Sequence, residues 1–184
     1  MRVIAGKARR ILLKTVDSTS TRPTTDRYKE TLFNMINNDL YDTLFLDLFS
    51  GSGGIGIEAL SRGARKAYFV ENNKQACECI KSNLKATHLE EDGVLISMDV
   101  FSALKSLELN NMVFDYIFMD PPYNNEIEKN VLLELVNKSY VDEYTTIIVE
   151  ASSETRLDYL EEFGYRLIKK KEYKTNYHVF LRKA

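Results

Sequence analysis

Segments of strand type and segments of helical type alternate from residue 43 to residue 164 of this chain. The strand segments, such as TLFLDLF at 43–49, are nearly continuous apolar runs, which is typical of strands buried on both faces. This order predicts parallel strands joined by right-handed helical crossovers. The expected strands are 43–49, 66–71, 93–99, 114–120 and 145–151, and the expected helices are 55–63, 73–87, 100–108, 126–139 and 154–164.

Two further segments of strand type, residues 165–173 and 177–183, close the chain. Too few residues separate them for a crossover helix, so they are expected to form an antiparallel hairpin. The predicted fold is therefore α/β, a doubly wound, mostly parallel seven-stranded sheet with a C-terminal antiparallel hairpin. Such a hairpin is less common than a plain Rossmann-like sheet and so narrows the fold.

The residues before position 41 are expected to form a short N-terminal β/α extension. Residues 2–6 and 9–16 resemble short strands, and the polar stretch 17–25 leads into an amphipathic helix over 26–38 that Thr24 or Thr25 can cap. At 184 residues the chain has the size of one domain. We expect a single domain over 1–184, with the extension over 1–40 and a ligand-binding core over 41–184.

Composition excludes several classes of protein. No apolar run approaches the roughly 20 residues of a membrane span, and the basic N-terminus leads into no long apolar stretch, so a cytoplasmic location is expected. Cys77 and Cys79 are too close for an unstrained disulfide and are expected to be reduced. With only two further histidines, His88 and His178, no zinc-ligand spacing exists and no metal is expected.

A glycine loop follows the first expected strand of the core and opens a helix. Gly51, Gly53 and Gly56 satisfy the pattern G-x-G-x-x-G, which lets the backbone turn tightly and approach a ligand. Glu71 ends the next strand, 20 residues after Gly51, where an acid accepts hydrogen bonds from ribose hydroxyls. Asp99 ends the following strand and is placed for an adenine amino group. These sites predict a nucleoside-bearing ligand, with plain structural turns as the alternative.

Asp47, which lies inside the first strand end, helps to choose between two such ligands. NAD and S-adenosylmethionine both fit a glycine loop followed by a ribose-binding acid. An acid at this point would repel a pyrophosphate, whereas it would favour the ammonium group of a methionine moiety, directly or through water. The position of Asp47 therefore favours S-adenosylmethionine over NAD.

The sequence Asp120-Pro121-Pro122-Tyr123 ends the fourth strand, at the same edge as the glycine loop. The prolines fix the backbone and remove two N–H donors, so acid and carbonyl oxygens face a target that donates N–H bonds. A planar exocyclic amine is such a target, and acceptors on its hydrogens stabilise positive charge as a methyl group arrives. Tyr123 can stack on a base. The structural alternative is a Pro-Pro turn that ends a strand.

This combination resembles the class I, S-adenosylmethionine-dependent methyltransferases that modify exocyclic amines with a [D/N]-P-P-[Y/F] motif. With RVIAGKARR, TRPTTDRYKETLFNMI and FLDLFSGSGGIGIEALSRGA, nearly the whole chain is similar to the bacterial 16S rRNA guanine-N2 methyltransferase family, RsmD. The chain departs from the family pattern at two positions where glycine is common, with Lys174 after Tyr173 and Met98 before Asp99. The resemblance implies that S-adenosylmethionine is bound by Asp47, Gly51, Gly53, Glu71 and Asp99, that the guanine amine is held by Asp120, Pro121, Pro122 and Tyr123, and that Arg22 to Arg27 lie near the mouth of the site.

The charge pattern fits a nucleic-acid partner. Residues 1–29 and 165–184 each carry a net charge of +6, against −14 for residues 30–164. Two basic ends on an acidic body suggest a surface for a polyanion, if the fold brings them together. The expected partner is 16S rRNA, within the small ribosomal subunit or an assembly intermediate, bound by a monomer. The candidate RNA contacts are Arg9, Arg10, Arg22, Arg27, Lys170 and Lys171, with Lys7, Lys14 and Lys169 as further phosphate contacts.

Other functions remain open at this point. An N6-adenine methyltransferase on DNA or RNA uses the same motif, although the chain has no separate domain for reading DNA. A protein glutamine methyltransferase usually carries Asn-Pro-Pro-Tyr instead. A non-enzymatic alternative is an RNA-binding module with a vestigial cofactor pocket, and an NAD oxidoreductase is disfavoured by Asp47 and the closing hairpin.

Overall fold

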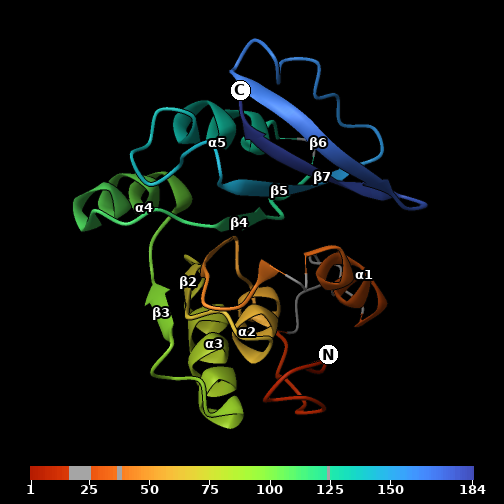
Figure 1. Ribbon diagram of the computed structural model, residues 1–184. Helices are drawn as coiled ribbons and strands as arrows, with labels where there is room; N and C mark the ends of the chain where they lie inside the picture. Colours follow the sequence, from red (N-terminus) through yellow and green to blue (C-terminus); the bar gives the residue numbers. More distant parts are fainter. Residues whose placement is uncertain (17–25, 37–38, 124) are drawn as a thin grey trace.

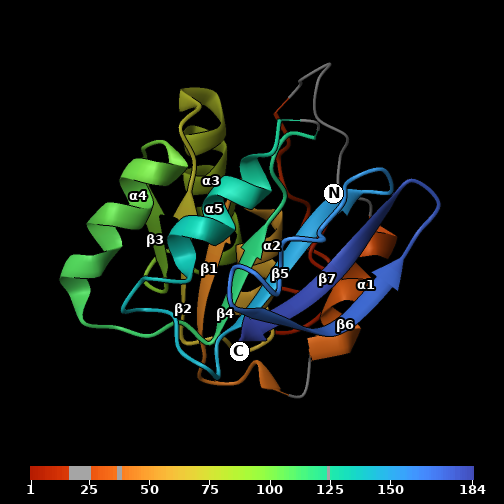
Figure 2. The same cartoon turned by 90° about the horizontal axis from the view of Figure 1, so that it is seen from above.

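A seven-stranded sheet forms the centre of the molecule (Figures 1 and 2). The computed structural model describes residues 1–16, 26–36, 39–123 and 125–184. The strand order is β3-β2-β1-β4-β5-β7-β6; the first five strands are parallel, and β7 is antiparallel to both β5 and β6. The predicted sheet and its closing hairpin are therefore confirmed. The strands are β1 (Leu44–Leu48), β2 (Lys66–Val70), β3 (Gly93–Ile96), β4 (Tyr116–Met119), β5 (Thr146–Ser152), β6 (Tyr165–Glu172) and β7 (Asn176–Lys183).

Helices cover both faces of the sheet, as a doubly wound fold requires (Figure 1). One apolar cluster joins α1, α2 and α3 to residues such as Phe45 and Phe69, and the other joins α4 and α5 to residues such as Leu46 and Ile117. Side chains of successive strand residues therefore enter opposite clusters, which explains the continuous apolar runs. The helices are α1 (Asp26–Ile36), α2 (Gly54–Ser61), α3 (Lys74–Thr87), α4 (Val100–Leu107), the 3₁₀ turn η2 (Glu108–Asn110) and α5 (Ile127–Leu135).

The N-terminal segment does not form the two expected strands. Its only β pairing among the described residues is an isolated bridge between Arg2 and Leu12, so the prediction of strands over 2–6 and 9–16 was wrong. Around this bridge the segment bonds to itself, with Val3 donating to the carbonyl of Ile11 and Leu13 to that of Met1. Elsewhere it bonds to α2, where Glu58 accepts from the N–H groups of Ile4 and Ala5, at 2.9 and 3.0 Å. The backbone therefore has partners without a longer ladder.

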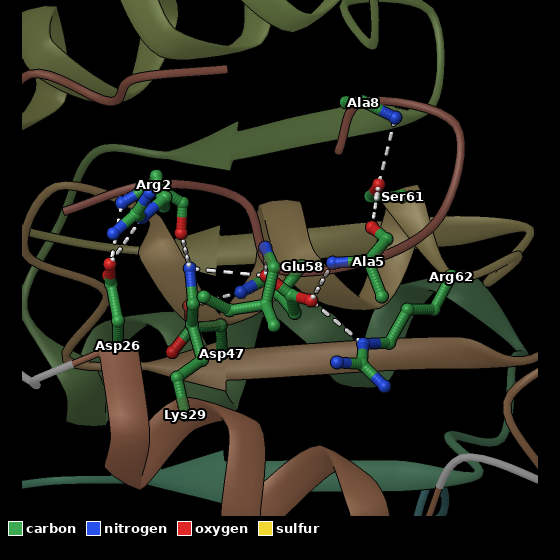
Figure 3. A network of polar contacts seen from close by, with 11 residues as sticks. Arg2, Ala5, Ala8, Asp26, Lys29, Asp47, Glu58, Ser61 and Arg62 are labelled. Carbon is green, nitrogen blue, oxygen red and sulfur yellow. Dashed lines mark hydrogen bonds and ion pairs between the residues drawn. The ribbon is translucent and has the colours of Figure 1, made fainter. Parts of the chain in front are cut away.

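A buried polar network joins this segment to α1 and α2 (Figure 3). Lys29 of α1 donates to the carbonyl of Arg2 and lies 3.1 Å from Glu58, and Arg62 donates to the same carboxylate at 2.8 Å. The network fixes α1 beside the sheet. The capping residues expected for this helix, Thr24 or Thr25, and its expected last residues, 37–38, lie outside the described residues.

The segment 154–164 was predicted to be a helix, and this prediction was wrong. It forms successive turns, in which Leu160 donates to the carbonyl of Leu157 and Gly164 to that of Glu161. The hydroxyl of Tyr177 donates a hydrogen bond to the carbonyl oxygen of Thr155 at 2.6 Å. Contacts with the neighbouring strand and the core therefore override the helical pattern of this short segment.

Among the described residues, no helix combines the length and the apolar character that crossing a membrane requires. The helices that do form are short; α3, the longest, has 14 residues.

Candidate functional site

A cavity of about 660 Å³ opens at the carboxyl ends of β1, β2 and β4. Its walls are largely apolar, with Val70, Phe101 and Ile127 among them, and four acids reach it: Glu71, Asp99, Asp120 and Glu150. The volume and mixed lining are those of a small-molecule site. The ligand edge predicted from the sequence therefore coincides with a real cavity, which also takes in Gly51, Pro121, Pro122 and Tyr123.

The three glycines of the loop have different structural roles. Gly51 lines the cavity at φ +54°, and no atom lies within 4 Å of the place where a Cβ would be. Gly53 precedes α2 at φ +81°, which ordinary side chains avoid. A Cβ on Gly56 would lie 2.3 Å from the ring of Phe69, so this glycine permits the close packing of α2 on β2. Only Gly51 of the three reaches the ligand space.

Glu71 and Asp99 both lie on the cavity wall, and both also accept hydrogen bonds from backbone N–H groups. Glu71 accepts hydrogen bonds from the N–H groups of Gly51, Asn72 and Asn73, at 2.8, 2.9 and 2.8 Å. An ionised carboxylate has about four acceptor positions, so roughly one remains for a ligand. Asp99 caps α4 by accepting from the N–H of Ser102 at 3.0 Å, and these bonds lower its pKa. Both carboxylates are thus pre-oriented before any ligand binds.

Asp47 lies beneath the glycine loop and not on the cavity wall. Its side chain is almost fully buried and accepts a hydrogen bond from the N–H of Gly56 at 3.0 Å. Burial, followed by the charge of Glu71, raises the pKa of Asp47 to about 7. Asp47 supports the loop directly, so any influence on a ligand in the cavity passes through that loop or through a bridging water.

Asp120 presents its carboxylate to the cavity at the end of β4. No described residue donates a hydrogen bond to it. Burial, then the charges of Glu150 and Asp47, raise its pKa well above the ordinary value. Tyr123 is 39% exposed, and its hydroxyl donates to Glu150 at 3.2 Å. The motif therefore combines a carboxyl group that has no hydrogen-bond partner among the described residues with an accessible aromatic side chain.

Among the residues missed from the sequence are Tyr28, Glu150 and Asn176, which line the cavity, and His178, which contacts Glu150 from outside it. Glu150 lies in β5, at the same edge as the other strand-end acids, and that position was a signal that could have found it. Tyr28 comes from α1, and its ring contacts Tyr173 of the hairpin, with centroids 4.8 Å apart. Figures 1 and 2 place α1 beside the hairpin, and this packing closes one side of the cavity.

The predicted RNA contacts fall into two groups. Arg9, Arg10 and Arg27 line a second cavity of about 560 Å³ between the N-terminal segment and α1. Lys170 and Lys171 lie elsewhere, on the edge strand β6, where Lys170 pairs with Glu172 at 2.7 Å. The structure therefore brings together three of the predicted arginines and separates them from the lysines. Arg22 lies outside the described residues, and the second cavity also contains Arg2, Asp26 and Glu30.

Over the described ranges, no group of three or more His, Cys, Asp or Glu side chains is placed to hold a metal ion. The two cysteines are separate thiols, Cys77 buried and Cys79 partly exposed.

The sheet order, the closing hairpin and the ligand edge define the class I, S-adenosylmethionine-dependent methyltransferase fold. The chain belongs to the family described as "Conserved hypothetical protein 95", whose sequence profile matches residues 1–182. This agrees with the resemblance seen in the sequence, because the relatives of the chain include RsmD proteins.

Three similar proteins illustrate the extent of the match. YlbH of Bacillus subtilis, provisionally named an rRNA methyltransferase, is 40% identical over 172 residues, which is 94% of this chain and 92% of that protein. Ribosomal RNA small subunit methyltransferase D of Haemophilus influenzae is 34% identical over 158 residues, 85% of this chain and 81% of that protein. The structure of the candidate methyltransferase yhhF of Escherichia coli superposes with a TM-score of 0.82, at 28% identity over 100% of this chain and 98% of that one.

Proposed function

We propose that this protein transfers a methyl group from S-adenosylmethionine to the N2 amine of a guanine in small-subunit ribosomal RNA. The observation that carries the proposal is that Asp120-Pro121-Pro122-Tyr123 shares one cavity with Gly51, Glu71 and Asp99. An amine-binding motif and a nucleoside-binding edge thus face the same space. The names of the relatives, which specify ribosomal RNA, support the choice of substrate.

The residues of the cavity fit the cofactor. Gly51 leaves open space beside its backbone, and Glu71 retains acceptor capacity for ribose hydroxyls. Asp99 is exposed at the mouth, beside the apolar ring of Phe101, and suits an adenine amino group. Asp47 and Gly53 act through the shape and charge of the loop. When bound, S-adenosylmethionine supplies the methyl group on its sulfonium.

The motif residues then act on the amine. The carboxylate of Asp120 and the proline carbonyls accept hydrogen bonds from the amine, whose nitrogen lone pair is otherwise delocalised into the base. As positive charge develops on that nitrogen, the nearby carboxylates of Asp120 and Glu150 stabilise it in a partly desolvated site. Tyr123 offers its exposed face for stacking, which orients the base.

The RNA backbone is assigned to the basic residues of the N-terminal segment. Arg9, Arg10 and Arg27 line the second cavity, whose volume of about 560 Å³ is large enough for phosphate groups. Asp26, which lines the same cavity, is paired with Arg2 at 2.9 Å. Arg22, Lys170 and Lys171 remain predicted contacts. The single-domain arrangement and the choice of ribosomal RNA, whole subunit or assembly intermediate, belong to the same proposal.

The proposal is tested by tritium transfer from labelled S-adenosylmethionine into small ribosomal subunits from cells that lack the enzyme. Naked rRNA, DNA and total protein serve as parallel substrates, followed by nucleoside analysis. Label in N2-methylguanosine of the rRNA supports the proposal. Label in N6-methyladenine or in protein overturns the target, and a protein that binds cofactor but labels nothing is better explained as a binding module.

A further inference from the structure

Asp120, just after β4, and Glu150, within β5, occupy neighbouring positions on adjacent parallel strands. Met119 of β4 pairs with Val149 of β5, so the next residue of each strand is an acid. Both carboxylates line the same cavity, and the charge of Glu150 contributes to the raised pKa of Asp120. Glu150 is therefore next to the carboxylate assigned to the amine.

The carboxylate of Glu150 is held in one orientation by side chains from two other parts of the chain. Its Oε1 accepts from the amide Nδ2 of Asn176 at 2.6 Å and from the hydroxyl of Tyr123 at 3.2 Å. Its Oε2 lies 3.0 Å from Nε2 of His178, whose Nδ1 lies 3.2 Å from the hydroxyl of Tyr173. Since an ionised carboxylate only accepts, Nε2 carries the hydrogen. Three of about four acceptor positions are used, and one remains.

This wall of the cavity has more acceptors than the described residues have donors to match. The Oδ1 of Asn176 also lacks a hydrogen-bond partner among the described residues, but it is buried away from the open cavity, so the acceptors that a ligand can reach are those of Asp120 and Glu150. Asp120 has no donor among the described residues, and Glu150 has one position left. A buried acceptor without a donor is costly, so such a group calls for an explanation. A ligand whose edge presents two adjacent N–H groups would explain these acceptors, because it would donate one hydrogen bond to each carboxylate.

The Watson–Crick edge of guanine is such an edge, because its N1–H lies beside its N2 amine. Adenine presents the opposite pattern, with an N1 lone pair beside its N6 amine. We propose that Glu150 determines the base specificity of the enzyme by accepting the N1–H of guanine while Asp120 accepts from the amine. This inference rests on the proposed function. An adenine in the same pose would turn its N1 lone pair toward a carboxylate, which is repulsive and leaves that carboxylate without a donor.

The test compares RNA substrates that carry either guanine or 2-aminopurine at the modified position. 2-Aminopurine keeps the N2 amine but has no N1–H. The wild-type enzyme is expected to methylate the guanine substrate about 100-fold more efficiently, as kcat/KM, because the buried acceptor loses its donor. In Glu150→Gln the amide can donate to N1, so the ratio is expected to fall below about tenfold. Glu154→Gln, an exposed acid a few residues further on, serves as the control and should keep the wild-type ratio.

Each outcome separates the inference from the proposed function. Wild-type enzyme that methylates both substrates equally, or a Glu150→Gln ratio as large as that of wild type, overturns the inference and leaves the proposed function standing. The second result would assign the preference to the missing O6 of 2-aminopurine. Wild-type enzyme that transfers nothing to guanine in rRNA overturns both. Should Glu150→Gln not fold, Asn176→Ala, which removes the amide that orients the carboxylate, is expected to narrow the ratio, and an unchanged ratio would contradict the inference.

Discussion

Lys29 and Glu58 form an ion pair 3.1 Å long with both side chains fully buried. Burial lowers the pKa of Lys29, and the carboxylate of Glu58 opposes that shift. The same carboxylate binds Arg62 and the backbone N–H groups of Ile4 and Ala5, so one acid joins α1, α2 and the N-terminal segment. Such a network ties the basic N-terminal residues to the methyltransferase core.

Replacement of Glu58 by glutamine should therefore destabilise the protein strongly. A buried lysine and arginine would lose their counter-charge, which costs about 3 kcal/mol or more in free energy of unfolding. Urea unfolding followed by circular dichroism measures the change. Glu78→Gln is the matched control, because its pair with Lys81 is exposed to solvent and is expected to contribute little to stability. Equal unfolding midpoints for the two variants would contradict the structural role of Glu58.

The buried carboxyl of Asp47 makes stability depend on pH. Its pKa is about 7 in the folded protein and near 3.8 in the unfolded chain, so between these values the folded state binds the extra proton. Stability from this group is thus present at low pH and is lost as the pH rises toward 7, by up to about 4 kcal/mol in total. Asp47→Asn cannot ionise, although it keeps an acceptor for Gly56.

The difference in unfolding free energy between Asp47→Asn and wild type should therefore shift in favour of the variant from pH 4 to pH 8. Urea unfolding at the two pH values measures it, and other titrating groups cancel because both proteins share them. The exposed Asp158→Asn serves as the control, with no such shift expected. A difference that stays constant with pH would show that Asp47 is not held protonated by its burial.

Replacement of Glu71 by glutamine should weaken cofactor binding. The variant loses the charged acceptor for ribose hydroxyls and one or more of the bonds that fix Gly51 and Asn72. Loss of a charge-assisted hydrogen bond corresponds to roughly a tenfold or greater rise in Kd. Calorimetric titration with S-adenosylhomocysteine measures Kd, and the exposed Glu91→Gln is the control. An unchanged Kd would remove Glu71 from the ligand site.

Charge reversal at Arg9 and Arg10 should weaken RNA binding without affecting the cofactor. Both residues line the second cavity, beside α1, and neither lines the cavity that contains Asp120. Removing one side chain that binds a phosphate should reduce the slope of log Kobs against log salt by about 0.7 for single-stranded RNA. Filter binding at several salt concentrations gives that slope. Charge reversal at Lys81 and Lys85, which are exposed on α3, changes the net charge equally and should have little effect on RNA affinity. Equal losses of affinity in the two double variants would mean that net charge alone determines RNA binding.

The sequence by itself determined the order of elements and the ligand edge. Continuous apolar runs, glycines at fixed spacing and acids at strand ends are local signals, and parallel strands must bring their carboxyl ends to one edge. Glu71, Asp99 and Asp120 could therefore be placed at one site from their positions alone, and the structure puts all three around one cavity.

Only the tertiary structure decided which side chains meet across long separations. Glu150 contacts Asn176 and His178, which lie 26 and 28 residues away in the sequence. The backbone of Ile4 donates to Glu58, which lies 54 residues away. Contacts of this kind also occur where local patterns predicted strands over 2–6 and 9–16 and a helix over 154–164: Ile4 and Ala5 donate to Glu58, and Tyr177 donates to the carbonyl of Thr155. The physical reason is that a backbone group needs a partner of any kind, and where a distant side chain or turn supplies it, local propensity no longer decides the conformation.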